Sequence, residues 1–420
     1  MEVLAEHEQW SRSELNRLQL EKTNQIWRHA INYVPYYRQL FRERSLPKEF
    51  GSLEEYVSNV PVLDKMAVRG GMLLSEKPRP GRWVYTGGST GIPLAMYREN
   101  DASLEMVCCQ YRSRALFGVD VFDRTAMVWG HGVSFAPGFS GRTAKLRRRL
   151  EDLLRDRVRL SAYRLGKEDI RRYLRKMTSF KPVLLYGYSS AVYLLSLEAL
   201  QSGVKVDSLR LVTLTSDQVT HDIRDTVQRG FRTNVVEEYG AAECQVIAYE
   251  DEKHLFRVRE DLVMVETQPA QDNYHKIIIS VLNNPSFPLL RYDIGDLTDR
   301  PVDRADAGFA LLGPVVGRKN DFLISRSGRR VHPLDASFLE HHKLIKRFRA
   351  HQFSDGRVLL SLEVDSQARD LSPSGLGKKL SDLLEGQTVE VRLTESIPPT
   401  VPGKHAWVVS ELADLQQPSS

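Results

Sequence analysis

Apolar residues recur at helical spacing near the start of the chain, and this pattern predicts a helix over residues 6–34 that Pro35 ends. The residues that define the apolar face are Leu20, Trp27, Ile31 and Val34. A second helical pattern covers residues 102–118. The first part of the chain is therefore expected to be helical on both sides of an intervening polar, glycine-rich segment.

Short apolar runs alternate with helical patterns through the middle of the chain. The predicted strands cover residues 182–187, 209–216 and 234–240, and helical patterns over 189–203 and 221–231 separate them. Strand, helix and strand at this spacing are typical of parallel βαβ units. The sequence therefore predicts an α/β fold in which helices flank parallel-rich sheets.

The pattern changes from about residue 255 onward. Apolar runs at 263–267 and 276–282 predict strands joined by turn-rich segments, which indicates a β-rich subdomain. From residue 317 a compact α+β unit is expected, with strands over 358–364, 388–393 and 405–412 and a helix over 375–386. We therefore predict a large N-terminal domain, residues 1–316, and a small C-terminal domain, residues 317–420.

Composition narrows the class of protein. The chain has 420 residues, of which 41% are hydrophobic and 27% charged, as in an ordinary globular protein. Its net charge of +5 is too small to indicate nucleic-acid binding unless it is concentrated, as it is in the arginine-rich segment 141–160.

That arginine-rich segment has two interpretations. It is either a face that binds phosphate or an acidic partner, or a solvated amphipathic helix, and we favour the helix. Its inward residues would be Leu146, Leu150, Leu153 and Leu154.

Cysteine content and hydropathy bear on the compartment. The three cysteines, Cys108, Cys109 and Cys244, form no paired framework and favour a reducing compartment. The first ten residues lack the apolar region of a signal peptide, and no run of 18 apolar residues predicts a membrane helix. We therefore expect a cytoplasmic protein without membrane insertion, and its oligomeric state stays open.

The segment VYTGGSTGIP, residues 84–93, is a candidate phosphate-binding loop. Its glycines allow successive backbone N–H groups to turn toward an anion, and Thr86, Ser89 and Thr90 add hydroxyl donors. It is not the loop of P-loop NTPases, because Gly91 is followed by Ile and Pro instead of Lys and Ser or Thr. A flexible hairpin turn is the alternative that this segment alone leaves open.

Four further motifs follow in order: EEYGAAE at 237–243, PLLRYDIGD at 288–296, GRKNDFL at 317–323 and PPTVPGK at 398–404. With these five motifs the chain resembles the acyl-adenylate-forming (AMP-forming) ligase superfamily. The early segment 31–65 resembles its phenylacetate–CoA ligase-like branch, which includes capsular-polysaccharide-associated adenylating proteins. The resemblance covers nearly the whole chain, and it implies a large adenylating domain with a small mobile lid domain.

The resemblance implies ATP and Mg²⁺ as cofactors and assigns roles at the nucleotide. The loop from Thr86 to Gly91 would bind the phosphates, Tyr239 would lie against adenine, Asp296 would accept from the ribose hydroxyls, and Arg318 would contact ribose or phosphate. The implied ATP-binding residues are Thr86, Gly87, Gly88, Ser89, Thr90, Gly91, Tyr239, Asp296 and Arg318.

The resemblance also implies two catalytic residues and a hinge. Glu243 would bind Mg²⁺, for which a carboxylate oxygen is a suitable ligand. Lys404 would reach the reacting α-phosphate and carboxylate from the small domain, and Asn320 would be the hinge about which that domain moves. Asn320 stands where relatives usually have Asp or Lys, and Gly87 stands where they often have Ser.

The acyl substrate would lie near a second set of residues, which are Tyr188, Gly240, Ala241 and His131. His131 is as well explained by a structural role, so its assignment stays open. Some relatives carry a metal cluster after the Glu243 motif. Here Cys244 and His254 are too few ligands for structural zinc, and we predict none.

The implied reaction is ATP-dependent activation of a carboxylic acid to acyl-AMP with release of pyrophosphate, followed by acyl transfer. Coenzyme A is the expected acceptor and an aromatic or other bulky acid the expected substrate, so small molecules are the expected partners and nucleic acid is not. An amine acceptor, giving an amide, is the first alternative. A catalytically weak nucleotide-binding partner protein is the second, because of the departures at Gly87 and Asn320.

Overall fold

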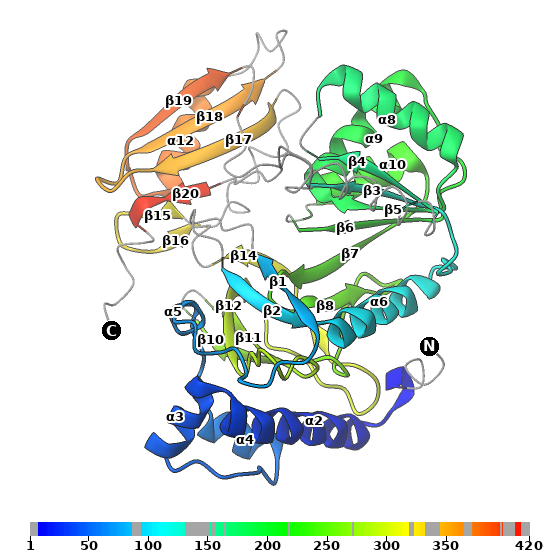
Figure 1. The fold of residues 1–420 in the computed structure, drawn as a ribbon. Coiled ribbons are helices and arrows are strands. Elements are labelled where there is room, and N and C mark those ends of the chain that lie inside the picture. Colours follow the sequence, from blue (N-terminus) through cyan, green and yellow to red (C-terminus); the bar gives the residue numbers. More distant parts are fainter. Residues whose placement is uncertain are drawn as a thin grey trace, which may run out of the picture. The chain divides into compact units, whose positions relative to one another are not determined.

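The computed structural model describes residues 7–85, 94–130, 152, 156–162, 165–216, 219, 221–270, 273–318, 323–331, 345–364, 372–394, 397 and 408–412 (Figure 1). The chain divides into two compact units. The first comprises Met1–Pro269, His275–Ile294 and Thr298–Val315, and the second Ala270–Tyr274, Gly295–Leu297 and Val316–Ser420. The domain limits given above, 1–316 and 317–420, stay a prediction. None of the helices in the described part of the chain combines the length and apolar character needed to cross a membrane.

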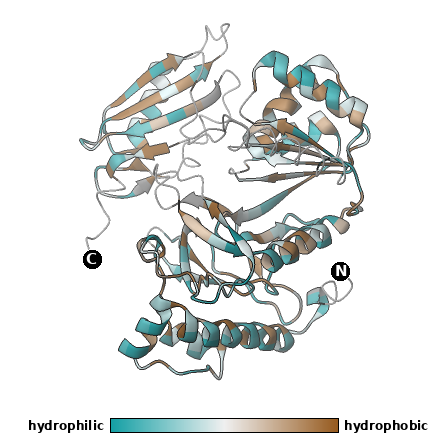
Figure 2. Cartoon of the chain, viewed as in Figure 1, coloured by the Kyte–Doolittle hydropathy of each residue, from teal (hydrophilic) through white to brown (hydrophobic). Residues whose placement is uncertain are grey.

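The N-terminal segment forms a short 3-10 helix, η1 (His7–Gln9), and four α-helices. These are α2 (Arg12–Tyr33), α3 (Pro35–Glu43), α4 (Leu53–Asn59) and α5 (Lys65–Arg69). Helix α2 begins at a capping box in which Ser11 and Glu14 satisfy each other's backbone N–H groups. Figure 2 shows both hydrophilic and hydrophobic residues along α2, whose apolar side buries Trp27. Pro35 ends α2 as expected and also begins α3 at its N1 position, which suits proline's fixed φ.

The largest sheet among the described residues has eight strands, in the order β13-β9-β8-β7-β6-β5-β3-β4. Its strands are β3 (Thr125–Trp129), β4 (Arg157–Ser161), β5 (Leu184–Tyr188), β6 (Leu211–Thr215), β7 (Asn234–Ala241), β8 (Gln245–Glu250), β9 (Phe256–Val258) and β13 (Leu311–Leu312). Strands β3 to β7 pair in parallel, and β8, β9 and β13 continue the sheet antiparallel. The α/β fold class expected from the sequence is confirmed.

Helices cover both faces of this sheet (Figure 1). On one face α8 (Lys167–Phe180), α9 (Ser189–Ser202) and α10 (His221–Phe231) share an apolar core with β3 to β7. On the other face lies α6 (Asn100–Ala115), which packs Met106 and Cys109 against Val246 of β8. The carboxyl ends of the five parallel strands therefore meet at one edge between these helical layers, the edge where open α/β sheets bind ligands.

One expectation for the arginine-rich segment is wrong at its C-terminal end. Residues 157–160 belong to strand β4 and not to an amphipathic helix, because Val158 and Leu160 alternate with arginines and are buried at a period of two. The predicted inward positions Leu146, Leu150, Leu153 and Leu154 lie outside the described residues.

Two further sheets are smaller. A hairpin pairs β1 (Gly81–Tyr85) with β2 (Ala95–Glu99) in antiparallel register. A four-stranded sheet in the order β10-β11-β12-β14 follows the eight-stranded sheet along the chain. Its strands are β10 (Val263–Pro269), β11 (His275–Val281), β12 (Tyr292–Thr298) and β14 (Val315–Arg318).

The second unit contains a four-stranded sheet in the order β19-β18-β17-β20 and a short hairpin. Its elements are β15 (Leu323–Ile324), β16 (Arg330–Val331), β17 (Ile345–Gln352), β18 (Val358–Val364), α12 (Pro373–Leu383), β19 (Val389–Thr394) and β20 (Val408–Ser410). Helix α12 buries Leu376 and Leu380 against this sheet, so the tail has a core of its own. The final strand is shorter than the predicted 405–412, since residues 411 and 412 are helical.

Candidate active site

The carboxyl edge of the parallel strands brings together several of the predicted site residues. Tyr188 ends β5, and the segment from Tyr239 to Glu243 spans the end of β7 and its turn into β8. The predicted residues Thr86, Gly87, Gly88, Ser89, Thr90, Gly91, His131, Asn320 and Lys404 lie outside the described residues. Arg318 is described only as the last residue of β14.

The hairpin that flanks the predicted phosphate loop is anchored on a buried carboxylate. Glu99, at the end of β2, is 1% exposed and accepts from the backbone N–H of Ser286 at 2.8 Å and from its hydroxyl at 2.5 Å. Asn284 adds a side-chain bond from its amide to the carbonyl of Tyr97 on β2 at 2.9 Å. These contacts hold β2 in place. Because β1 pairs with β2, they also fix β1, so both strands that flank residues 86–93 are anchored.

The turn that carries Glu243 requires glycine at position 240. A Cβ on Gly240 would lie 1.9 Å from the carbonyl oxygen of Gln245, a backbone atom that a rotamer change cannot move away. The β7–β8 register shifts between Tyr239 and Gly240, and Gln245 has φ +68°, so the turn is tight and bulged. Ala241, which follows, is half-buried.

Glu243 is half-buried and has one protein partner among the described residues. The hydroxyl of Tyr292 donates to its Oε1 at 3.5 Å, and burial together with Glu243 raises the pKa of Tyr292 well above its ordinary range. In the described part of the chain its Oε2 has no hydrogen-bond partner. A carboxylate oxygen left open in this way fits Mg²⁺, which is held by one or two carboxylates and by substrate phosphates.

Arg98 is a site residue that the sequence reasoning missed. Its guanidinium donates to the carbonyl of Ala242, so it ties β2 to the turn that carries Glu243. Burial lowers its pKa to about 10, partly offset by Cys244 and Glu243, and it stays cationic at neutral pH. Its position five residues after the glycine-rich loop could have suggested a role at the site. Its partner Ala242 could not be inferred, because it is 144 residues away in the sequence.

The predicted aromatic site residues are buried in the apolar core. Tyr239 is 8% exposed and packs edge-on against Phe256, with ring centroids 6.4 Å apart. Tyr188 is 7% exposed, and its ring lies 4.5 Å from that of Trp129 at the end of β3. Asp296, the predicted ribose ligand, is buried on β12.

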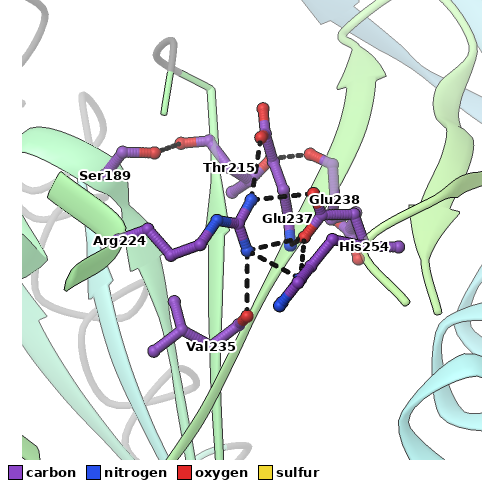
Figure 3. Close-up of polar contacts among 8 residues, drawn as sticks. Ser189, Thr215, Arg224, Val235, Glu237, Glu238 and His254 are labelled. Atoms are coloured by element: carbon purple, nitrogen blue, oxygen red, sulfur yellow. Dashed lines mark hydrogen bonds and ion pairs between the residues drawn. The ribbon is translucent and has the colours of Figure 1, made fainter. Parts of the chain in front are cut away.

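A charged cluster lies beside β7, on the side of α10 (Figure 3). Arg224 pairs with Glu250 at 2.7 Å and with Glu237 at 3.7 Å, and it also donates to the carbonyl of Val235 at 3.0 Å. His254 contacts Glu250 at 3.4 Å. His254 and Cys244, weighed above as zinc ligands, thus have different neighbours, and no group of three or more metal-ligating side chains occurs among the described residues. The expectation of no zinc stays a prediction.

Comparison with known proteins identifies the class of this fold. No protein-family model matches the chain. A crystal structure of 2-hydroxyisobutyryl-CoA ligase in the postadenylation state, with 2-HIB-AMP bound, aligns with a TM-score of 0.74 over 96% of this chain and 91% of that chain, at 15% identity. The fold is therefore that of the acyl-adenylate-forming ligases.

Sequence relatives then identify the branch. The chain is 26% identical over 345 residues to phenylacetate-coenzyme A ligase of Thermus thermophilus, covering 77% of this chain and 74% of the relative. It is 20% identical over 417 residues to protein CapK of Staphylococcus aureus, covering 93% and 89%. The chain is thus similar over most of its length to AMP-forming ligases of the phenylacetate–CoA ligase-like branch, and the resemblance inferred from its motifs is confirmed.

Proposed function

We propose that this protein activates a carboxylic acid with ATP, forming an acyl adenylate and pyrophosphate, and then transfers the acyl group to the thiol of coenzyme A. The observation that carries the proposal is the similarity to phenylacetate–CoA ligases over most of the chain. An aromatic or other bulky acid is the proposed substrate.

Nucleotide binding is assigned to the loop from Thr86 to Gly91, which holds the phosphates, with Tyr239 at adenine and Asp296 and Arg318 at ribose. Glu243 holds Mg²⁺, which when bound offsets phosphate charge. The open Oε2 of Glu243 and the cation of Arg98 beside the same turn support this assignment. Tyr188, Gly240, Ala241 and His131 border the acyl group.

In the first step a carboxylate oxygen of the acid attacks the α-phosphorus of ATP, and the bond from this phosphorus to the bridging oxygen of pyrophosphate breaks. Lys404 neutralises the charge shared by the α-phosphate and the carboxylate, and Asn320 lets the small domain deliver it. In the second step the thiol sulfur attacks the acyl carbonyl, AMP leaves, and the thiol proton is released. Positioning of two anions in line supplies most of the rate.

The test is an acid panel in which hydroxylamine traps the activated acyl group, run with and without coenzyme A, with pyrophosphate release measured in parallel. We expect acid-dependent pyrophosphate release and a thioester when coenzyme A is present. A product that forms with amines but not with coenzyme A would replace the thiol by an amine acceptor. ATP binding without turnover of any acid would instead favour the nucleotide-binding partner protein.

Lys404 is tested in the same assay. Lys404→Ala should lower the rate of adenylation at least about 100-fold, because a cation is lost where charge accumulates in the transition state. Lys378→Ala, on the exposed side of α12, is the matched control and should keep the parental rate. A Lys404→Ala protein that adenylates as fast as the parent would refute the catalytic role of this lysine.

A further inference from the structure

A buried polar network lies on the face of the large sheet that α6 covers. Its centre is Glu238 of β7, which is 4% exposed. The hydroxyl of Tyr186 donates to Oε1 of Glu238 at 2.7 Å, and the amide of Gln110 on α6 donates to both carboxylate oxygens at 3.1 Å. Arg114, also on α6, lies 3.7 Å from Oε2. Burial and the neighbouring Glu238 raise the pKa of Tyr186, so its hydroxyl stays a donor.

Arg114 is incompletely satisfied in this network. It is 5% exposed, yet its Nε and Nη2 make no hydrogen bond in the described structure, and Nη2 is the atom that lies 3.7 Å from Oε2 of Glu238. Its guanidinium lies over the ring of Tyr186, 4.8 Å from the centroid, and 5.5 Å from that of Tyr111. A buried N–H without an acceptor destabilises the folded state, and the effect is larger on a charged group. Such a group indicates an absent acceptor.

The network adjoins the region assigned to the acyl group. Trp129 stacks on Tyr186 with centroids 5.4 Å apart, and the same ring contacts Tyr188. Glu238 directly precedes Tyr239, and its carbonyl accepts from the hydroxyl of Thr215 at 2.8 Å (Figure 3). Four side chains around the network are only half-buried, so the network is not wholly shielded from solvent: Gln110, Tyr111, Trp129 and Tyr186.

The charges in the network select a kind of ligand. Arg114 and Glu238 cancel, so a second carboxylate would face Glu238 without a cation of its own, and an amine would face Arg114. A hydroxyl group is neutral and can both accept from the free N–H groups of Arg114 and donate to Glu238 or to the amide oxygen of Gln110. It is the smallest group that satisfies both sides.

We propose that Arg114 and Glu238 are specificity-determining residues that bind a hydroxyl group on the acyl substrate, remote from its reacting carboxylate. The inference rests on the proposed function and narrows it from bulky acids to hydroxylated ones. A structural brace between α6 and the sheet is the competing explanation, and it accounts for the ion pair of Nη2 with Glu238 but leaves Nε of Arg114 without an acceptor.

The test compares matched acids, phenylacetate with 4-hydroxyphenylacetate and 3-phenylpropanoate with its 4-hydroxy counterpart, in the pyrophosphate-release assay. The parent should prefer the hydroxylated acid by at least about ten-fold in kcat/KM. Glu238→Gln and Tyr186→Phe should reduce this ratio. The double variant Arg114→Met, Glu238→Leu should invert it, because an apolar site then receives the unhydroxylated acid without leaving polar groups unpaired.

Tyr249→Phe is the matched control for Tyr186→Phe. Tyr249 is paired with Glu238 in the β7–β8 register and lies near Arg114, but its hydroxyl bonds Thr213 at 2.8 Å. This variant should keep the parental ratio. Equal kcat/KM for both acids of each pair in the parent, or a double variant that keeps the hydroxyl preference, would overturn the proposal.

The proposed function and this inference fail in distinguishable ways. If no acid gives pyrophosphate, the proposed activity is rejected. The inference is then tested by binding: we measure how far each acid, with ATP present, raises the melting temperature. A larger rise with the hydroxylated acid that is lost in the double variant would support it. Equal rises in parent and double variant would refute it.

Discussion

Glu237 is a carboxyl group in an environment that disfavours its charged form. Its side chain is 17% exposed, and burial and the nearby Glu250 raise its pKa to about 8, although Arg224 opposes the shift. The unfolded chain releases this proton near pH 4.5. Between these values the folded state binds more protons than the unfolded state, so the stabilisation present below pH 4.5 is lost as the pH rises toward 8.

We therefore expect Glu237→Gln to raise the melting temperature relative to the parent by more at pH 8 than at pH 5.5. Glu252→Gln, at an exposed carboxylate nearby, should give the same small difference at both values. Thermal unfolding followed by circular dichroism measures both. A Glu237→Gln difference that does not change with pH would mean that Arg224 keeps Glu237 ionised.

At the scale of elements, the β1–β2 hairpin depends on Ser286. Its hydroxyl donates to Glu99 and accepts from the backbone N–H of Arg79 at 2.8 Å. Ser286→Ala leaves the buried carboxylate with one donor fewer and should lower the free energy of unfolding by about 1–3 kcal/mol. Because the hairpin flanks residues 86–93, the KM for ATP should rise in the same variant.

Urea unfolding and steady-state kinetics check this prediction. Ser58→Ala removes an exposed hydroxyl that bonds within α4 and should change neither quantity appreciably. If Ser286→Ala lowers stability but leaves the KM for ATP unchanged, the position of the hairpin does not affect nucleotide binding.

Across the first unit as a whole, a buried ion pair joins segments that are far apart in the sequence. Arg112 of α6 donates to both oxygens of Asp261 at 2.7 and 3.1 Å, and His7 lies 3.4 Å from the same carboxylate, which is 1% exposed. Arg112→Met leaves this charge buried without its main partner and should lower the free energy of unfolding by about 3–5 kcal/mol.

The double variant Arg112→Met, Asp261→Leu should recover much of that loss, since no buried charge remains. Arg229→Met, which breaks an exposed i,i+4 pair with Asp225 on α10, should cost less than about 1 kcal/mol. Denaturant titrations compare the three. A double variant no more stable than Arg112→Met would show that packing, and not the stranded charge, dominates.

Local periodicity predicted most elements because it depends on neighbouring residues. The apolar run at 184–188 forms β5, whose ends lie within two residues of the predicted strand. Helix α6 covers residues 100–115, where the sequence predicted a helix over 102–118. Charge density misled at residues 157–160, where Arg157 and Arg159 suggested a helix surface. The alternation of Val158 and Leu160 was the better guide, because burial in a sheet follows a period of two.

Site residues within short local motifs were predicted from the sequence, and those defined by distant contacts were not. Glycine at 240 and a carboxylate at 243 belong to a short motif, and the tight β7–β8 turn explains the glycine. Arg98 and Arg114 belong to no such motif, and their significance depends on which distant groups they meet.

The sequence by itself determined the fold class and the resemblance to AMP-forming ligases, because strand and helix periodicity, loop glycines and motif order are all local properties of the chain. Only the tertiary structure decided that Glu238 meets Tyr186 and Gln110, which are 52 and 128 residues away in the sequence. Burial removed water from these groups, so each must find a partner in the fold or in a ligand.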